Sequence, residues 1–194
     1  QGLIYATSMG ADFVGYWDAD LATPLETIPD FNRIVTRYHD VDVVFGSRCR
    51  LLGHRIERTL VRRTISRVCS LLARMAVKLP ISDTQCGAKF LRNTNTLRKT
   101  LNVPFTAGWL FDVELFTRIS RYTTDRTRAF YQYPLSEWSE IEGSKVSAKA
   151  VFKSGLQMLR LIVEARTGFL QQKLTASANS EIVILPSAPA RTAA

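Results

Sequence analysis

Histidine and cysteine, the residues that build most zinc centres and disulfide frameworks, are scarce in this sequence. It contains two histidines and three cysteines among 194 residues. His39 and His54 show no ligand spacing, and Cys49, Cys69 and Cys86 are odd in number and fit no metal-binding pattern. We interpret the cysteines as free, structural thiols of a protein from a reducing compartment.

Long apolar runs are also missing. No window reaches about 18 consecutive apolar residues, so the sequence predicts no membrane-spanning helix. With 46% hydrophobic residues the chain can bury one ordinary core, and we expect one domain. The sequence opens on Gln1 without a visible signal peptide. We therefore expect a fragment whose first structural elements are missing.

Acidic residues are nearly absent from one basic segment. Between Arg48 and Lys78 nine lysines and arginines face a single acid, Glu57, whereas the whole chain has a net charge of +9. The rest of the chain is therefore close to neutral. Such a concentrated basic block favours an anionic partner, which can be a nucleic acid, lipid headgroups or a phosphorylated substrate.

The first half of the chain has the pattern of a strand, a helix and a second strand. A helix that Gly10 closes comes first, Phe13–Trp17 and Val41–Gly46 are the strands, and Thr23–Glu26 has the form of a capping box. We expect the helix between the strands to reach about Tyr38, with its first turns disturbed by Pro29. This unit predicts a parallel sheet, at whose edge Asp18, Asp20 and the segment Gly46-Ser47-Arg48 lie together.

Two carboxylates, Asp18 and Asp20, follow the first strand in the stretch GYWDADLATP. A turn, a helix start and a metal site are the competing explanations. Because alternate residues of an extended chain project to one side, the pair could present hard oxygen ligands to Mg²⁺ or Mn²⁺. Thr23 is the better helix cap, so the pair is not needed for capping.

The segment 57–79 has helical periodicity. Its apolar residues recur at spacings of three and four and predict one apolar face, made of Val61, Ile65, Val68, Leu72, Met75 and Leu79. Two interpretations stay open. The helix can pack on the core with Arg63, Arg67 and Arg74 in water, or it can lie on an anionic membrane.

The second half contains a polar loop at 81–87 that leads into a short strand, a strand at 130–138 and a helix at 151–174. Asp112 and Glu114 lie in an apolar stretch and are either buried charges that pair with partners or part of a site near the acceptor cleft. We divide the chain into a catalytic domain at 1–150, a basic amphipathic helical extension at 151–174 and a disordered tail at 175–194.

Five motifs, in their order along the chain, resemble those of family-2 glycosyltransferases with the GT-A fold, and within them the polyprenyl-phosphate glycosyltransferases. The motifs are GYWDADLATP, VVFGSR, DTQCGAKF, WLFDVEL and EWSEIEGSK. The resemblance covers about residues 1–150. It implies an α/β fold with a mostly parallel sheet flanked by helices, and a first strand and nucleotide-base loop that would precede Gln1.

The resemblance also implies roles for individual residues. Asp18 and Asp20 match the D-x-D pair that binds the sugar nucleotide and its metal, with Asp20 as the more direct ligand. Asp83 matches an acidic residue near the reacting sugar. The remaining matches are basic or hydroxyl residues near phosphates: Ser47 and Arg48 at the acceptor phosphate, Ser144 and Lys145 at the diphosphate.

The implied enzyme is an inverting, metal-dependent hexosyltransferase that uses Mg²⁺ or Mn²⁺. Its donor would be UDP-glucose or GDP-mannose, its acceptor a polyprenyl phosphate, and it would lie on the cytoplasmic face of an anionic membrane. Because a phosphate monoester is already anionic at neutral pH, the nucleophile hardly needs a general base. We therefore expect Asp83 to orient the sugar hydroxyls or the acceptor, and the role of a base stays open for it. Two other functions compete with this one: a metal-dependent sugar-phosphate nucleotidyltransferase and a basic nucleic-acid-binding module. We do not expect a nucleic acid among the partners.

Overall fold

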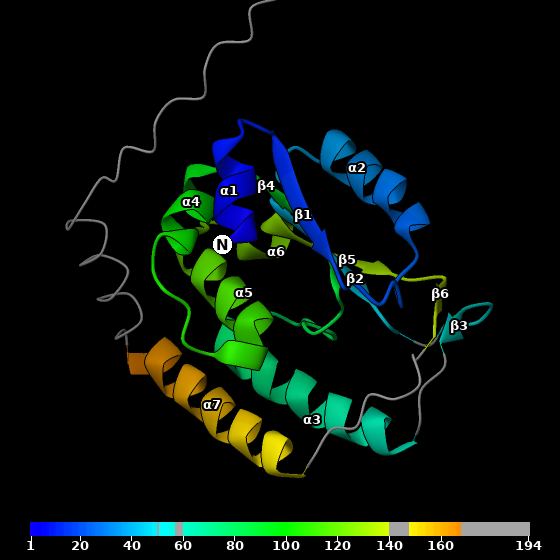
Figure 1. The fold of residues 1–194 in the computed structure, drawn as a ribbon, viewed down its shortest axis with the longest axis vertical. Helices are drawn as coiled ribbons and strands as arrows, with labels where there is room; N and C mark the ends of the chain where they lie inside the picture. Colours follow the sequence, from blue (N-terminus) through cyan, green and yellow to red (C-terminus); the bar gives the residue numbers. More distant parts are fainter. Residues whose placement is uncertain (50, 57–59, 140–147, 168–194) are drawn as a thin grey trace, which may run out of the picture.

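The computed structural model of the chain describes residues 1–49, 51–56, 60–139 and 148–167 (Figure 1). Its centre is a four-stranded sheet in the order β1-β4-β2-β5. The strands are β1 (Phe13–Trp17), β2 (Val43–Ser47), β4 (Ala88–Arg92) and β5 (Phe130–Pro134). A short parallel pair, β3 (Arg55–Ile56) with β6 (Glu137–Trp138), lies beside it.

The predicted α/β class is confirmed, and the sheet is mixed: β1, β2 and β5 run in one direction and β4 runs against them. β2 and β5 are parallel, whereas β4 pairs antiparallel with both β1 and β2. β1 and β2 therefore run in the same direction, as a strand–helix–strand unit requires, but β4 lies between them. The local pattern could not show this insertion, because β4 follows β2 by about 40 residues in the chain.

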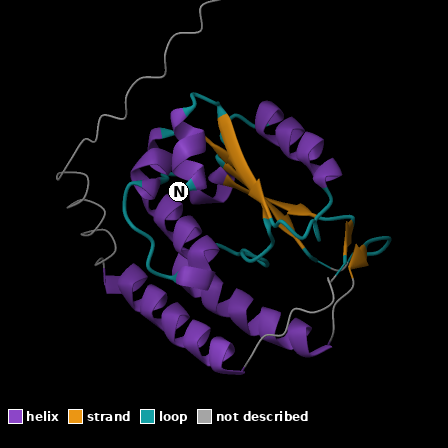
Figure 2. Ribbon diagram, viewed as in Figure 1, coloured by secondary structure: helices purple, strands orange, loops and turns teal. Residues whose placement is uncertain are grey.

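Helices cover both faces of the sheet (Figure 1, Figure 2). One face carries α2 (Ile28–Arg37). The other face carries the helices α1 (Gly2–Ser8), α3 (Leu60–Val77), α4 (Asn95–Leu101), α5 (Phe111–Tyr122) and α7 (Ala148–Thr167). A short helix, α6 (Arg126–Ala129), leads into β5. The described part also has two 3₁₀ turns, η1 (Leu25–Thr27) and η2 (Gly108–Leu110).

Alternation along the strands divides the interior into two cores. In β2, Val43 and Phe45 join the core under α5, whereas Val44 joins the core under α2. The core under α2 includes Phe31 and Val35 of that helix. Because successive side chains of a strand point to opposite faces, one apolar run fills both layers.

The start of the α2 segment differs from the predicted capping box. The hydroxyl of Thr23 lies 3.8 Å from the sulfur of Cys86 and does not cap the helix. Residues Leu25–Thr27 instead form the 3₁₀ turn η1, and α2 begins at Ile28. Pro29 therefore lies in the first turn, where its missing N–H costs nothing, and it does not disturb the helix.

Glu114 forms a buried ion pair with Arg118. A buried charge with a partner was one of the two possibilities that the sequence left open for Glu114. The two residues lie one turn apart on α5, with Nη2 of Arg118 at 2.5 Å from Oε1 of Glu114. Arg118 also donates to the carbonyls of Thr100, Val103 and Pro104, and Glu114 accepts from two backbone amides at 2.7 and 2.9 Å. The pair thus fixes the connection between α4 and α5 and has a structural role.

The helix α7 shares the core with the sheet. Met158, Leu161 and Ile162 pack in the same apolar cluster as Val43 and Phe45. It also lies alongside α3, at the edge of the molecule away from α2 (Figure 1). The division of the chain at residue 150 stays a prediction. Within the described residues, no helix is both long enough and apolar enough to cross a bilayer.

Candidate active site

Three segments meet at one edge of the sheet. β1 ends at Trp17 and is followed by Asp18, β2 ends at Ser47 and is followed by Arg48, and the loop 82–87 enters β4. The backbone N–H of Asp18 donates to the carbonyl of Gly87 at 2.8 Å. The sequence-based expectation that the ends of the two strands share an edge is confirmed, and the loop before β4 joins them there.

Arg48 and Asp83 form a bidentate ion pair at this edge. Nε and Nη2 of Arg48 donate to the two carboxylate oxygens of Asp83 at 2.7 and 2.8 Å. The backbone N–H of Arg48 adds a third bond at 3.0 Å. Burial disfavours the guanidinium charge, but the hydrogen bonds and charge of Asp83 outweigh it and raise the pKa of Arg48 above its ordinary value.

The ring of Trp138 covers the guanidinium of Arg48, whose Cζ lies 5.1 Å from the ring centroid. Trp138 is therefore a wall of the site. Together, Asp83 and Trp138 hold the planar guanidinium in one orientation. Arg48 is thus not a solvated surface charge, because only 15% of its side chain is exposed.

Ser47 is fully buried. Its hydroxyl lies 3.2 Å from that of Ser82 and accepts from Nε2 of Gln132 at 2.9 Å. Gln132 also bonds the hydroxyl and the backbone N–H of Ser82. This side-chain cluster ties the ends of β2 and β5 to the loop before β4, so the geometry favours a supporting role for Ser47 over contact with an acceptor phosphate.

Asp18 is packed against the backbone of Gly87. A Cβ added to Gly87 would lie 1.8 Å from Oδ2 of Asp18, so no other residue fits at this position without displacing the carboxylate. Burial raises the pKa of Asp18 above its ordinary value, and the carboxylates of Asp20 and Asp112 act in the same direction. Lys89 and Arg48 oppose them, because their positive charges favour the ionised carboxylate.

Asp20 lies in a tight turn and not on an extended strand, so the predicted alternation of the Asp pair is wrong. The N–H of Leu21 donates to the carbonyl of Asp18, and Leu21 has a φ of 54°. Oδ1 of Asp20 accepts from the N–H of Ala22 at 3.0 Å. Asp20 is therefore a turn residue. Its side chain is exposed, and its other carboxylate oxygen, Oδ2, takes no part in this turn bond.

The sequence interpretation missed Lys89. Its side chain is fully buried in β4, and its Nζ lies 2.8 Å from Oδ1 of Asp112 and 2.5 Å from the carbonyl oxygen of Cys86. Tyr16 donates to the same carboxylate oxygen, and burial together with Asp112 raises the pKa of Tyr16 well above its ordinary value. The available signal was a lysine inside the apolar strand AKFLR, because a buried lysine needs a partner.

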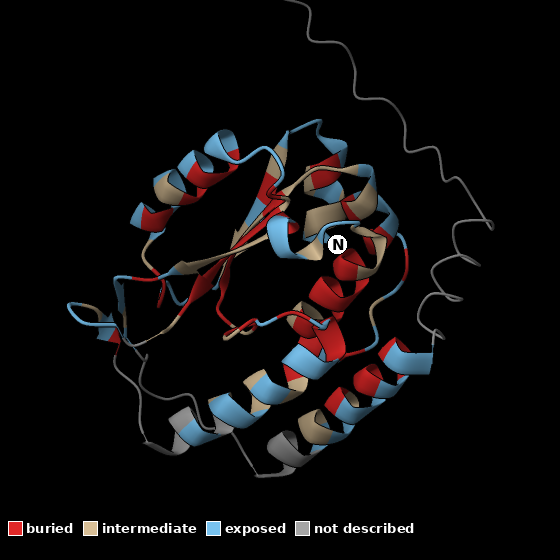
Figure 3. Cartoon of the chain, turned by 180° about the vertical axis from the view of Figure 1, so that it is seen from behind, coloured by how far each residue is buried: buried red, intermediate tan, exposed pale blue. Residues whose placement is uncertain are grey.

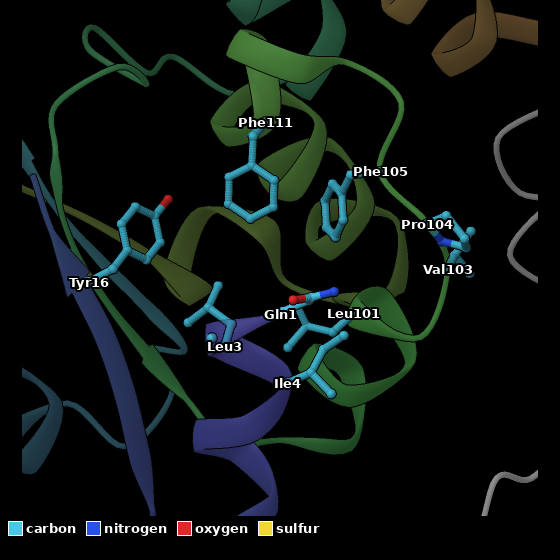
Figure 4. Close-up of a pocket in the computed structure, with 10 residues that line it drawn as sticks. Gln1, Leu3, Ile4, Tyr16, Leu101, Val103, Pro104, Phe105 and Phe111 are labelled. Atoms are coloured by element: carbon cyan, nitrogen blue, oxygen red, sulfur yellow. The ribbon is translucent and has the colours of Figure 1, made fainter.

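A cavity of ≈ 470 Å³ lies beside Tyr16 (Figure 4). Its walls are mainly apolar and come from α1, the connection after α4 and the start of α5. Phe111, Phe105 and Leu3 are among the side chains that enclose it. Asp18, Arg48 and Asp83 do not line it, whereas Tyr16, which donates to Asp112, does.

Ser144 and Lys145, which the resemblance places at the diphosphate, lie outside the described residues. The metal ligands of the sequence interpretation are Asp18 and Asp20. Within the described part of the chain, no group of three or more His, Cys, Asp or Glu residues could hold a metal ion without further ligands. Two carboxylates fit a magnesium ion that takes its other ligands from water and substrate phosphates.

The sequence of the chain is similar to those of several dolichyl-phosphate β-glucosyltransferases. A dolichyl-phosphate β-glucosyltransferase of Trichomonas vaginalis is 27% identical over 155 residues, which are 78% of this chain and 44% of that protein. The dolichyl-phosphate β-glucosyltransferase of Saccharomyces cerevisiae is 29% identical over 130 residues, 66% of this chain and 36% of that protein. A second Trichomonas protein of this type is 29% identical over 110 residues.

The chain is a distant homologue of the dolichyl-phosphate β-glucosyltransferases. These proteins are family-2 glycosyltransferases, so the resemblance that the five motifs carried is confirmed. No protein-family model matches the chain. The chain spans less than half the length of the homologues that it matches.

The raised pKa of Asp18 predicts a pH-dependent cost in stability. The folded state favours the protonated carboxyl of Asp18. This stabilises the fold fully below the unfolded pKa of about 3.9, and the stabilisation is lost as the pH rises through the higher pKa of the folded state. At pH 7 we expect Asp18→Asn to increase the free energy of unfolding by less than about 1 kcal/mol, because solvent screens this partly exposed group. Urea denaturation should show the difference shrinking towards pH 3. Asp12→Asn, at an exposed site before β1, is the control, and an equal gain there would contradict the explanation.

The close contact of Gly87 with Asp18 predicts a second effect. Gly87→Ala should destabilise the protein by about 1–3 kcal/mol, because the new methyl group displaces the carboxylate. Combining it with Asp18→Ala should recover most of that loss. Gly155→Ala in α7 meets nothing within 4 Å and should be neutral or stabilising. Additive losses in the double variant, measured by urea denaturation, would show that Asp18 is not what Gly87 accommodates.

Proposed function

We propose that the protein is a GT-A family-2 glycosyltransferase that moves glucose from UDP-glucose to a polyprenyl phosphate of the dolichyl type, at the cytoplasmic face of a membrane. The observation that carries the proposal is the meeting of Asp18, Arg48 and Asp83 at one sheet edge. This edge is where ligands bind in α/β sheets. The names of the homologues supply the sugar and the lipid acceptor, and they favour glucose over mannose.

The proposed reaction forms one bond and breaks one. An oxygen of the acceptor phosphate attacks the anomeric carbon of glucose, and the bond from that carbon to the β-phosphate oxygen of UDP breaks. UDP leaves with the bonding electron pair, and the configuration at the carbon inverts. The nucleophile is an anion at neutral pH, so no proton has to be removed from it.

The Arg48–Asp83 pair acts on the acceptor side in this proposal. Arg48 keeps Nη1 for the acceptor phosphate, while Nε and Nη2 hold Asp83. With three donors on its carboxylate, Asp83 is a positioning residue for Arg48 and not a general base. The exposed side chains of Leu51 and Leu52, which follow in the next loop, fit an acceptor with a hydrocarbon chain.

Asp18 and Asp20 act on the donor side, where they would hold Mg²⁺ or Mn²⁺ together with the donor diphosphate. A metal bound there would neutralise the charge that develops on the leaving diphosphate. Lys89 supports the ligand role of Asp18, because its ammonium, which binds Asp112, favours the ionised form of the Asp18 carboxyl. Ser144 and Lys145 belong to the same proposed donor site.

The products of the reaction test the proposal directly. Full-length protein with polyprenyl phosphate and a panel of nucleotide sugars should release UDP from UDP-glucose and yield glucosyl phosphoryl polyprenol. Pyrophosphate as the product would identify a nucleotidyltransferase instead. Salt-sensitive binding to duplex DNA without any sugar transfer would identify a nucleic-acid-binding module.

The carboxylate pair predicts a loss of turnover. We expect Asp20→Ala to lower kcat at least about 100-fold, because it removes a metal-binding carboxylate from the leaving-group side. Glu26→Ala, an exposed carboxylate on η1, is the matched control and should keep normal turnover. Urea denaturation of both variants checks the fold. Near-normal turnover of Asp20→Ala with an unchanged metal requirement would refute the assignment.

A further inference from the structure

Two buried hydrogen-bond donors at the sheet edge of the candidate active site have no acceptor. They are Nε1 of Trp17, the last residue of β1, and Nε2 of Gln85, in the loop that enters β4. In the part of the chain that the structure describes, the other buried side-chain atoms without a partner belong to α4 and α5, on Thr100, Arg118 and Arg121. A buried N–H without an acceptor lowers the stability of a fold, so each such group needs an explanation.

Packing explains the unpaired nitrogens of Trp17 and Arg118. The indole ring of Trp17 packs against Phe31 in the core under α2, with ring centroids 5.4 Å apart. The guanidinium of Arg118 lies over the ring of Phe105, with its Cζ 4.1 Å from the centroid. Gln85 differs from both, because it is a polar, half-buried side chain in a loop. Its unpaired amide therefore points to a ligand.

The loop before β4 puts Gln85 between the two halves of the candidate site. Two residues before it, Asp83 accepts from Arg48 on the proposed acceptor side. Two residues after it, the carbonyl of Gly87 accepts from the N–H of Asp18 on the proposed donor side. Because consecutive Cα atoms are about 3.8 Å apart, Gln85 lies within about 7.6 Å of each of these two loop residues. Most of the loop is buried, so it is a fixed platform for the side chain (Figure 3).

The amide of Gln85 suits a sugar hydroxyl. In the proposed reaction the anomeric carbon lies between the leaving diphosphate and the acceptor phosphate, so the hexose must occupy the space between the two halves of the site. Hydroxyl groups are neutral donors and acceptors, and a primary amide offers both an NH₂ group and a carbonyl oxygen. Rotation about the terminal bond of a glutamine side chain is easy, so Gln85 can turn its nitrogen towards a ligand. Phosphates are matched better by charged groups such as Arg48.

We propose that Gln85 binds a hydroxyl group of the transferred hexose and contributes to the selection of the sugar. The hydroxyl oxygen supplies the acceptor that Nε2 lacks within the described residues. A sugar without an oxygen at that position leaves the donor unpaired and is disfavoured. The inference rests on the proposed function, since it requires a nucleotide-sugar donor, and it goes beyond that function by naming a residue that reads the sugar.

Analogues of UDP-glucose that each lack one hydroxyl of the sugar test this inference. Full-length protein with polyprenyl phosphate is assayed for the release of UDP from each donor. We expect Gln85→Met, which keeps the length of the side chain, to lower kcat/KM for UDP-glucose about tenfold. One analogue should lose about tenfold with the parent chain and nothing further with Gln85→Met, because the variant already lacks the bond to that hydroxyl. Gln85→Ala, assayed in the same way, is the second variant.

Stability separates this role from a structural one. Gln85→Met replaces a buried N–H that has no acceptor with an apolar group, so urea denaturation should show an unchanged or higher free energy of unfolding. The matched control is Gln157→Met, at a half-buried glutamine of α7. The control should keep the kcat/KM of the parent chain and its order of preference among the analogues.

Two results would overturn the inference alone. Gln85→Met could keep the kcat/KM of the parent chain for UDP-glucose, or it could lower kcat/KM by the same factor for every analogue, which would show that Gln85 acts through the fold of the loop. A parent chain that releases no UDP from UDP-glucose would refute the proposed function and the inference with it. That outcome is distinguishable, because the parent chain shows it before any variant is compared.

Discussion

The antiparallel insertion of β4 between β1 and β2 is the constraint on which the site depends. Because β4 runs against both neighbours, the loop that enters it lies at the edge where β1 and β2 end. Backbone bonds then connect the segments: Asp18 donates to Gly87, and Arg48 donates to the carboxylate of Asp83. A parallel β4 would enter the sheet at the opposite edge, and Asp83 would lie far from Arg48.

Paired charges fill this edge, and most of them are removed from water. Arg48 with Asp83 and Lys89 with Asp112 each satisfy a side chain that could not be buried alone. Among the described residues Asp18 forms no ion pair of this kind, and burial raises its pKa. A carboxylate that is kept at a cost in stability is typical of a binding or catalytic position. The two ion pairs thus provide a rigid frame around the carboxylate of Asp18.

The sheet edge and the helix α3 make different demands on the chain. At the edge, hydrogen-bonded charges need a fixed geometry, which the cluster of Ser47, Ser82 and Gln132 supports. Small core residues such as Ala73 and Ala76 let α3 pack closely while its other side stays apolar and exposed.

By itself the sequence determined the local elements and the carboxyl-end placement of Asp18 and Arg48. Those features depend on neighbours within a few residues, such as the apolar run Phe13–Trp17 and the periodicity of the α3 segment. Only the tertiary structure decided that Asp83 binds Arg48 across 35 residues and that Tyr16 bonds Asp112 across 96. It also decided that Asp20 lies in a turn and that Lys89 binds Asp112 and acts on the charge of Asp18. These outcomes follow from strand pairing and burial, which connect distant residues and therefore leave no periodic signal in the sequence.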